Sequence, residues 1–231
     1  MLQDIRQIGV DRIVVGGDVL PGPMVREVLE FLLALDTPVE FIRGNCEVAG
    51  LAELAGKEAY SLPESVRSVI RWSARQLNPE HIRAIESWPK TLELKIEGAG
   101  RVLFCHGTPR DENEIFSRLT PEDRLLTIFG GLDADIVICG HTHMQFDRKI
   151  GSVRVLNAGS VGMPFGKAGA FWLLLGPQPE LRHTSYDLNE AAIQIRNTTY
   201  PQAEEFAAKY VLQPPSEEEM LRLFSQAELK R

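Results

Sequence analysis

Residues 134–143 read ADIVICGHTH. The apolar run IVIC predicts a buried strand, and the glycine turn after it carries His141 and His143. In an extended segment, residues i and i+2 face the same way, so we expect both imidazoles to point together while Thr142 points back. Two imidazoles on one face favour a ligand site over packing. The stretch therefore predicts an α/β protein with a functional site at the carboxyl end of this strand.

Three other segments repeat this design. Asp18 follows the strand-like run DRIVV, Asn45 follows VEFIR, and His106 follows RVLFC. Taken singly, Asp18 and Asn45 are typical of turns, and His106 is compatible with a buried histidine at a strand end. Because ligands bind at the carboxyl ends of strands in open α/β sheets, the repetition favours a shared site with His141 and His143.

These residue types suit divalent metal ions. A carboxylate such as Asp18 can bridge two ions, neutral imidazoles bind zinc, manganese or iron, and the amide oxygen of Asn45 suits harder ions. Paired metals roughly 3.5–4 Å apart clamp a phosphoryl group and generate hydroxide near neutral pH. We therefore expect divalent transition metal ions (Mn, Zn, Fe or Ni), ideally two, with a single ion as the alternative.

The rest of the chain fits one domain over residues 1–231. Its opening reads helix, strand, helix, strand, which is typical of an α/β protein. A helical insertion is expected at about 51–88, short strands follow it, and the tail from about 188 is expected to be helical.

Composition limits the function classes. The formal net charge of −7 argues against broad nucleic-acid binding, because an acidic surface repels phosphate backbones. Three cysteines, Cys46, Cys105 and Cys139, argue against a disulfide scaffold. Cys105 and Cys139 lie in apolar runs and are expected in the core. The longest apolar run is too short to span a bilayer and no signal peptide is evident, so we expect a cytoplasmic protein.

Five blocks carry a family resemblance. They are GGD at 16–18, GNCE at 44–47, HGT at 106–108, GHTH at 140–143 and NAGSVG at 157–162. Their order resembles the calcineurin-like metallophosphoesterase superfamily, and their spacing is similar to its small bacterial phosphodiesterase branch. The resemblance covers residues from about 11 to about 187. It implies two packed β-sheets flanked by helices, an αββα sandwich.

The resemblance also implies roles for the metal ligands. By it, Asp18 bridges both metals, His143 belongs to the first metal, and Asn45, His106 and His141 complete the second site. Asn157 and Ser160 in the NAGS turn are implied to support the ligands from beneath. His81 and His183 fall outside these blocks and are predicted to be surface residues.

The chain departs from the family pattern in two places. The Asp-x-His motif that usually ends the first strand is absent, and residue 1 already falls in the helix that should follow, so the first strand is expected to be missing. Many relatives carry histidine at the position of Cys46, where it stabilises the leaving group. Asn45 and Cys46 are the catalytic candidates, although Cys46 could equally be filler. Arg110 is either a phosphate contact or a solvated loop charge.

The expected function is the hydrolysis of small phosphate esters, with diesters preferred, by metal-activated hydroxide that attacks phosphorus in line. Two alternatives stay open. One is a catalytically weak or inactive scaffold that retains the metallophosphoesterase fold. The other is a structural metal site in a truncated domain. The sequence predicts no membrane partner and leaves the oligomeric state open.

Overall fold

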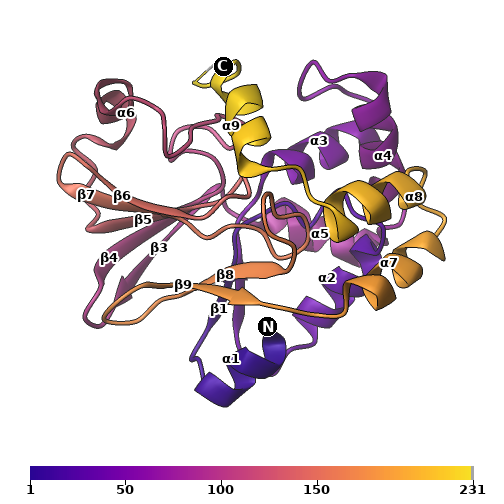
Figure 1. Ribbon diagram of the computed structural model, residues 1–231, viewed down its shortest axis with the longest axis horizontal. Coiled ribbons are helices and arrows are strands. Elements are labelled where there is room, and N and C mark those ends of the chain that lie inside the picture. Colours follow the sequence, from indigo (N-terminus) through magenta and orange to yellow (C-terminus); the bar gives the residue numbers. More distant parts are fainter. Residues whose placement is uncertain (230–231) are drawn as a thin grey trace.

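A computed structural model describes residues 1–229 of the chain (Figure 1). Its strands are β1 (Ile13–Val15), β2 (Val39–Phe41), β3 (Thr91–Ile96), β4 (Gly100–Cys105), β5 (Ile136–Cys139), β6 (Phe146–Ile150), β7 (Val153–Asn157), β8 (Ala170–Leu174) and β9 (Glu180–Thr184). Its helices are α1 (Leu2–Ile8), α2 (Val25–Leu33), α3 (Asn45–Leu54), α4 (Glu64–Ala74), α5 (Pro79–Ser87), α6 (Glu122–Phe129), α7 (Leu188–Arg196), α8 (Ala203–Phe206), the π-helical η1 (Ala207–Leu212) and α9 (Glu217–Ser225).

A five-stranded sheet in the order β3-β4-β5-β7-β6 forms the centre of the molecule. Strands β4, β5 and β7 are parallel, while β3 and β6 pair antiparallel at the two edges. All four residues of β5 are buried. Parallel strands covered on both faces read as continuous apolar runs, which is why IVIC predicts this strand from sequence alone.

Two strand pairs form a second layer against one face of this sheet. Strands β1 and β2 pair in parallel, and β8 and β9 pair antiparallel. Figure 1 shows β8, β9 and β1 together below the five-stranded sheet. Ile42, Phe104, Ile138 and Leu156 belong to the core between the layers, and Leu173 of β8 packs against it. The α/β fold with packed β-layers is confirmed, with the second layer built as two separate pairs within the described residues.

The other face of the five-stranded sheet is covered by α6. Leu125 and Phe129 from this helix are fully buried against Val137 of β5. Cys105 and Cys139 are buried in the same cluster, as expected from their apolar strands. Both cysteines are therefore core residues rather than site residues.

A third core joins β1 and β2 to the helices α2, α3, α4 and α5. Trp88 stacks on Phe41 with ring centroids 4.6 Å apart, and Leu29 and Ile85 are fully buried beside them. Helix α3 begins at Asn45, directly after β2, so the helical region starts at a predicted site residue.

The tail from α7 to α9 returns to the body of the protein. Figure 1 shows α7 beside α2, α8 beside α4, and α9 at the top between α6 and α3. Ala192, Ile195, Ala207 and Val211 form the core of α7 and η1. Within residues 1–229, none of the helices has the length and apolar character needed to cross a bilayer.

Candidate functional site

Four strand ends converge on one point. Asp18 follows β1, Asn45 begins α3 after β2, His106 follows β4 and His141 follows β5. One ligand-type atom from each of Asp18, His106 and His141 lies within 4.8 Å of the others. The two β-layers bring these residues together because the carboxyl ends of β1, β2, β4 and β5 share one edge of the molecule.

Asp18 lies at the centre of the cluster. Its Oδ2 is 3.2 Å from Nε2 of His106 and 3.9 Å from Nε2 of His143. Nδ1 of His141 is 3.2 Å from Nε2 of His106. The structure therefore brings together Asp18, His106, His141 and His143, which the sequence singled out. Asn45 is the first residue of α3, and the next residue along the helix donates its backbone N–H to Asp18.

Two of the imidazoles are oriented by backbone carbonyls. Nδ1 of His106 lies 2.7 Å from the carbonyl of Gly16, and Nδ1 of His143 lies 2.7 Å from the carbonyl of Met163. An N–H at Nδ1 donates to each carbonyl, so that Nε2 is the nitrogen directed at Asp18 in both rings. Carbonyls at the far nitrogen are the usual way proteins fix the tautomer and plane of a metal-binding histidine.

The GHTH turn has a different backbone from the one expected. His141 has φ 62° and His143 has φ 59°, so both are left-handed rather than extended. The two rings still face the cluster, but through a left-handed turn and not through strand alternation. Asp18 is also left-handed, with φ 56°. Left-handed backbone costs a non-glycine residue on the order of 1–3 kcal/mol, and such strain is concentrated at functional sites.

The NAGS turn holds the GHTH turn from below. Nδ2 of Asn157 donates to the carbonyl of Gly140 at 2.5 Å and to Oγ1 of Thr142 at 3.1 Å. Oγ of Ser160 accepts from the N–H of Met163 at 3.0 Å, and Met163 in turn accepts from His143. These contacts fix the positions of both histidines.

Glu47 is a site residue for which the sequence analysis gave no role. Its carboxylate is fully buried and accepts three backbone N–H groups: Asp18 at 2.8 Å, Leu20 at 3.0 Å and Gly44 at 2.7 Å. It thereby joins the loop after β1 to the loop after β2. The available signal was its place in GNCE, where an acid sits at the third helical position and can reach back to the N-terminus of α3.

The same two loops approach each other closely. A Cβ at Gly44 would lie 2.8 Å from the backbone nitrogen of Asp18, and one at Gly17 would lie 2.8 Å from Nδ1 of His106. Any larger residue would push the loops apart. The glycines of GGD and GNCE are therefore required by the packing that forms the cluster.

The electrostatics of the cluster depend on the pair Asp18 and His106. Burial alone would raise the pKa of Asp18, but the charge and hydrogen bond of His106 hold this pKa well below its usual range. Burial alone would lower the pKa of His106, but the carboxylate of Asp18 raises it to about 9. Burial, reinforced by the positive His106, lowers the pKa of His141 to about 3. His141 is thus a neutral imidazole, the form that binds metals.

Two buried atoms at the site lack hydrogen-bond partners within the described chain, Oδ1 of Asn45 and Nε2 of His141. A buried amide oxygen without a donor is costly, and native structures usually supply a partner or an ion. A divalent cation beside Asp18 would give both of these buried atoms a partner. The donor set of carboxylate, amide oxygen and imidazole nitrogens therefore fits a divalent transition metal.

Cys46 lies at the border between the site and the helical core. Its backbone N–H donates to Oδ1 of Asp18 at 3.3 Å, and its side chain packs against the core around Leu20 and Phe41. Burial, followed by the charges of Asp18 and Glu47, raises the pKa of the thiol well above its usual range. The thiol is thus protonated near neutral pH, and its catalytic role stays a prediction.

Arg110 lies on the loop after His106, where it binds Glu114. Its Nε donates to the buried carboxylate of Glu114 at 2.8 Å. On the same loop, Glu112 accepts from the hydroxyl of Tyr60 at 3.0 Å and pairs with Lys90 at 3.0 Å. Both cations are thus paired with carboxylates, and the contact of Arg110 with substrate stays a prediction.

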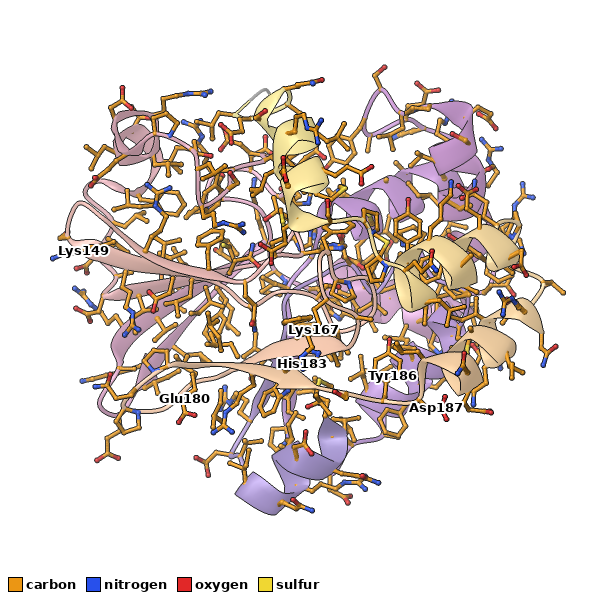
Figure 2. All side chains as sticks on the ribbon, viewed as in Figure 1. Lys149, Lys167, Glu180, His183, Tyr186 and Asp187 are labelled. Atoms are coloured by element: carbon orange, nitrogen blue, oxygen red, sulfur yellow. The ribbon has the colours of Figure 1, made fainter. Side chains whose placement is uncertain are left out.

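The two remaining histidines lie outside the cluster. His81 was predicted at the surface, and this prediction is wrong: the side chain is buried, beside Asn78 of its own helix cap and 3.7 Å from Glu30 of α2. His183 on β9 is only partly buried, and its ring contacts Lys167 and the carbonyl of Ala168. Figure 2 labels His183 of β9 close to Lys167, which lies in the connection before β8.

Comparison with known proteins identifies the family and the fold. Residues 1–176 match the profile of the calcineurin-like phosphoesterase superfamily domain. The fold is similar to that of a hypothetical protein from Pyrococcus horikoshii, with TM-score 0.73 and 16% identity over 93% of this chain and 91% of that one. It is also similar to that of a metallophosphoesterase from Sphaerobacter thermophilus, with TM-score 0.65 and 23% identity over 90% of this chain and 92% of that one. No curated protein sequence matches the chain.

Proposed function

The chain belongs to the calcineurin-like phosphoesterase superfamily, and we propose that it is a metal-dependent hydrolase of phosphate esters that prefers small phosphodiesters. One observation carries the proposal. Asp18, His106 and His141 converge from three chain segments, beside an amide oxygen of Asn45 that is buried without a hydrogen-bond partner in the described chain. This is the donor set that a divalent metal ion completes.

The ligands of the proposed centre are Asp18, Asn45, His106, His141 and His143. A divalent ion bound there would lower the pKa of a bound water and neutralise charge on the phosphoryl oxygens. Asp18 has a carboxylate oxygen within 4 Å of both His106 and His143, so it is the residue placed to contact ions on either side. The carbonyls of Gly16 and Met163 hold the two rings in the binding tautomer, which lowers the reorganisation needed on binding.

Charge around the site supports the preference for diesters. The loop after His106 carries Asp111, Glu112 and Glu114. Its cation Arg110 is paired with Glu114, and Lys90, which precedes β3, is paired with Glu112. A monoester carries close to two negative charges at neutral pH, whereas a diester carries one. Because like charges repel most strongly where water is excluded, the singly charged diester fits these surroundings better.

Three residues near the metal ligands are proposed to act on the substrate. Asn45 and Cys46 at the start of α3 are the catalytic candidates, and the raised pKa of the Cys46 thiol keeps it protonated. Arg110 is the candidate phosphate contact, with its guanidinium fixed in direction by Glu114.

Metal content and activity test the proposal together. The purified chain is loaded with Mn²⁺, desalted, and its metal measured by elemental analysis, and rates are measured on bis(p-nitrophenyl) phosphate and on p-nitrophenyl phosphate. We expect bound Mn²⁺ and a higher kcat/KM for the diester. The variant Asp18→Ala should lose more metal than His143→Ala, because Asp18 contacts both sides of the centre.

The matched control is His183→Ala, which removes an imidazole outside the cluster and should keep both metal and activity. Wild type that holds no more Mn²⁺ than His141→Ala would refute the metal centre. Full metal binding without turnover of either ester would refute the hydrolase and favour the scaffold alternative. A higher kcat/KM for the monoester would refute the diester preference alone.

A further inference from the structure

The ring of His143 is fixed from two directions by one loop. The carbonyl of Met163 accepts its Nδ1–H at 2.7 Å, and Phe165 stacks on the ring with centroids 5.4 Å apart and planes 16° from parallel. The first contact sets which nitrogen faces Asp18, and the second sets the plane of the ring. Both contacts come from the connection between β7 and β8, which has no strand or helix of its own.

The loop is held in turn by the C-terminal helix. Phe165 is 5% exposed and forms a core cluster with Met144 and Leu221, and Phe224 of α9 packs on its ring with centroids 6.0 Å apart. Met163 packs against the same cluster. Both residues that orient His143 thus depend on side chains from α9 for their own packing.

Backbone contacts bring the same two segments together. The N–H of Gly166 donates to the carbonyl of Pro215 at 2.8 Å, just before α9. Gly166 has φ 87°, and a Cβ there would meet Cγ of Glu217 at 2.8 Å. The approach is so close that only glycine fits, which indicates a specific contact and not incidental proximity.

Further contacts fasten α9 and the residues after it to the loop that follows His106. Arg118 pairs with Glu217 at 2.7 Å, and Oγ of Ser117 is bonded to the buried Glu228 at 3.2 Å. The N–H of Leu229 donates to the carbonyl of Ile115 at 2.9 Å. The helix therefore spans from the loop beside His106 to the loop beside His143.

From this chain of contacts we infer that α9 is a positioning element of the metal centre, which acts on His143 through Phe224 and Phe165. The inference rests on the proposed function, because it takes His143 as a metal ligand. Helix α9 lies outside residues 1–176, the part of the chain that matches the family profile. Phe165 and Phe224 are positioning residues and not ligands.

The physical reason is the freedom of an unsupported imidazole. A histidine on a left-handed turn can rotate about two side-chain bonds unless neighbours hold it. Metal binding then loses affinity, because fixing the side chain costs conformational entropy. Groups that orient metal-binding histidines typically change metal affinity about 10–100-fold when removed. Truncating Phe224 leaves His143 and Phe165 in place but removes one of the rings against which Phe165 packs.

A double-mutant cycle separates positioning from general stability. Co²⁺ is titrated into the metal-free full chain and followed by its visible absorption, for wild type, Phe224→Ala, His143→Ala and the double variant. We expect Phe224→Ala to weaken Co²⁺ binding about tenfold when His143 is present. In the His143→Ala background the same truncation should change the affinity less than about twofold, because the side chain through which Phe224 is inferred to act is gone.

Two further variants serve as controls. Leu223→Ala removes the neighbouring side chain of α9, which is 55% exposed, and should leave Co²⁺ affinity unchanged. Ile128→Ala truncates a buried residue of α6 on the opposite face of the sheet and lowers stability without touching His143. Its Co²⁺ affinity should equal that of wild type when both are measured well below their unfolding temperatures.

The outcomes are distinct. A Phe224→Ala effect that persists undiminished without His143, or that Ile128→Ala reproduces, would overturn the inference and leave the metal centre intact. Unchanged Co²⁺ affinity in either Phe224→Ala or His143→Ala would also overturn it. A wild type that binds no Co²⁺ would overturn the proposed function as well.

Discussion

The buried carboxylate of Glu47 accepts a hydrogen bond from the backbone N–H of Asp18 at 2.8 Å, across 29 residues of sequence. Through this bond and those from Leu20 and Gly44, one side chain joins the two loops that carry Asp18 and Asn45. Several N–H groups on one carboxylate favour its charged form, although burial and the charge of Asp18 raise its pKa above the usual value. The relative position of two proposed ligands thus depends on a residue that contacts neither the proposed metal ion nor the substrate.

Replacing Glu47 by glutamine tests the contribution of these hydrogen bonds to stability. Glutamine has nearly the same shape, but its amide group presents a donor where backbone donors already point. We expect Glu47→Gln to lower the free energy of unfolding by about 1–3 kcal/mol, the cost of a buried unsatisfied N–H. Urea denaturation of the metal-free protein measures it. The control Glu86→Gln, on the exposed side of α5, should change the same free energy by less than about 0.5 kcal/mol. Equal stability of the two variants would contradict the prediction.

The pKa of His106 predicts how metal binding depends on pH. The carboxylate of Asp18 raises this pKa to about 9, so the imidazole is protonated at pH 7 in the metal-free protein. A metal ligand must be neutral, so binding at pH 7 should release about one proton, and affinity should rise with pH until it levels off near the pKa of His106. Calorimetry of Mn²⁺ binding in buffers of different ionisation enthalpy counts this proton. His183→Ala should release the same number, and release of none at pH 7 would show that His106 is already neutral.

The left-handed backbone of His143 predicts an unusual preference for glycine. At φ 59° a residue with a Cβ is strained. The free energy of unfolding of the metal-free protein should therefore be about 1 kcal/mol larger for His143→Gly than for His143→Ala. Both variants should lose the same share of metal affinity. As a matched comparison, Ala84→Gly inside α5 should destabilise by roughly 1 kcal/mol, since the helix favours alanine. If His143→Ala were the more stable of the pair, the backbone at this position would not be left-handed in solution.

The burial of the three cysteines predicts how fast their thiols react in the native protein. Cys105 and Cys139 are buried in the core, and burial raises the pKa of all three thiols, including Cys46. Because the thiolate is the reactive form, we expect no fast reaction of the native protein with a disulfide reagent at pH 8 and three reactive thiols after denaturation. A single fast thiol that Cys46→Ser abolishes would show that Cys46 is open to solvent and ionised.

The sequence by itself determined the strands that carry the site and the residues at their ends. Apolar runs such as IVIC and the glycine turns after them are local signals, because a buried parallel strand is apolar along its whole length. The blocks GGD, HGT and GHTH predicted Asp18, His106, His141 and His143, and the structure brings these side chains together. The residue types alone were enough to indicate a divalent metal, since ligand preference follows from side-chain chemistry.

Only the tertiary structure decided how those residues are held. The left-handed turns at His141 and His143 replace the strand alternation expected from their spacing, and His81 is buried 3.7 Å from Glu30, which belongs to a different helix. The three N–H groups on Glu47 and the contact of Phe224 with Phe165 join segments far apart in the chain. Such contacts depend on how packed elements meet in space, and no local periodicity of the sequence encodes that meeting.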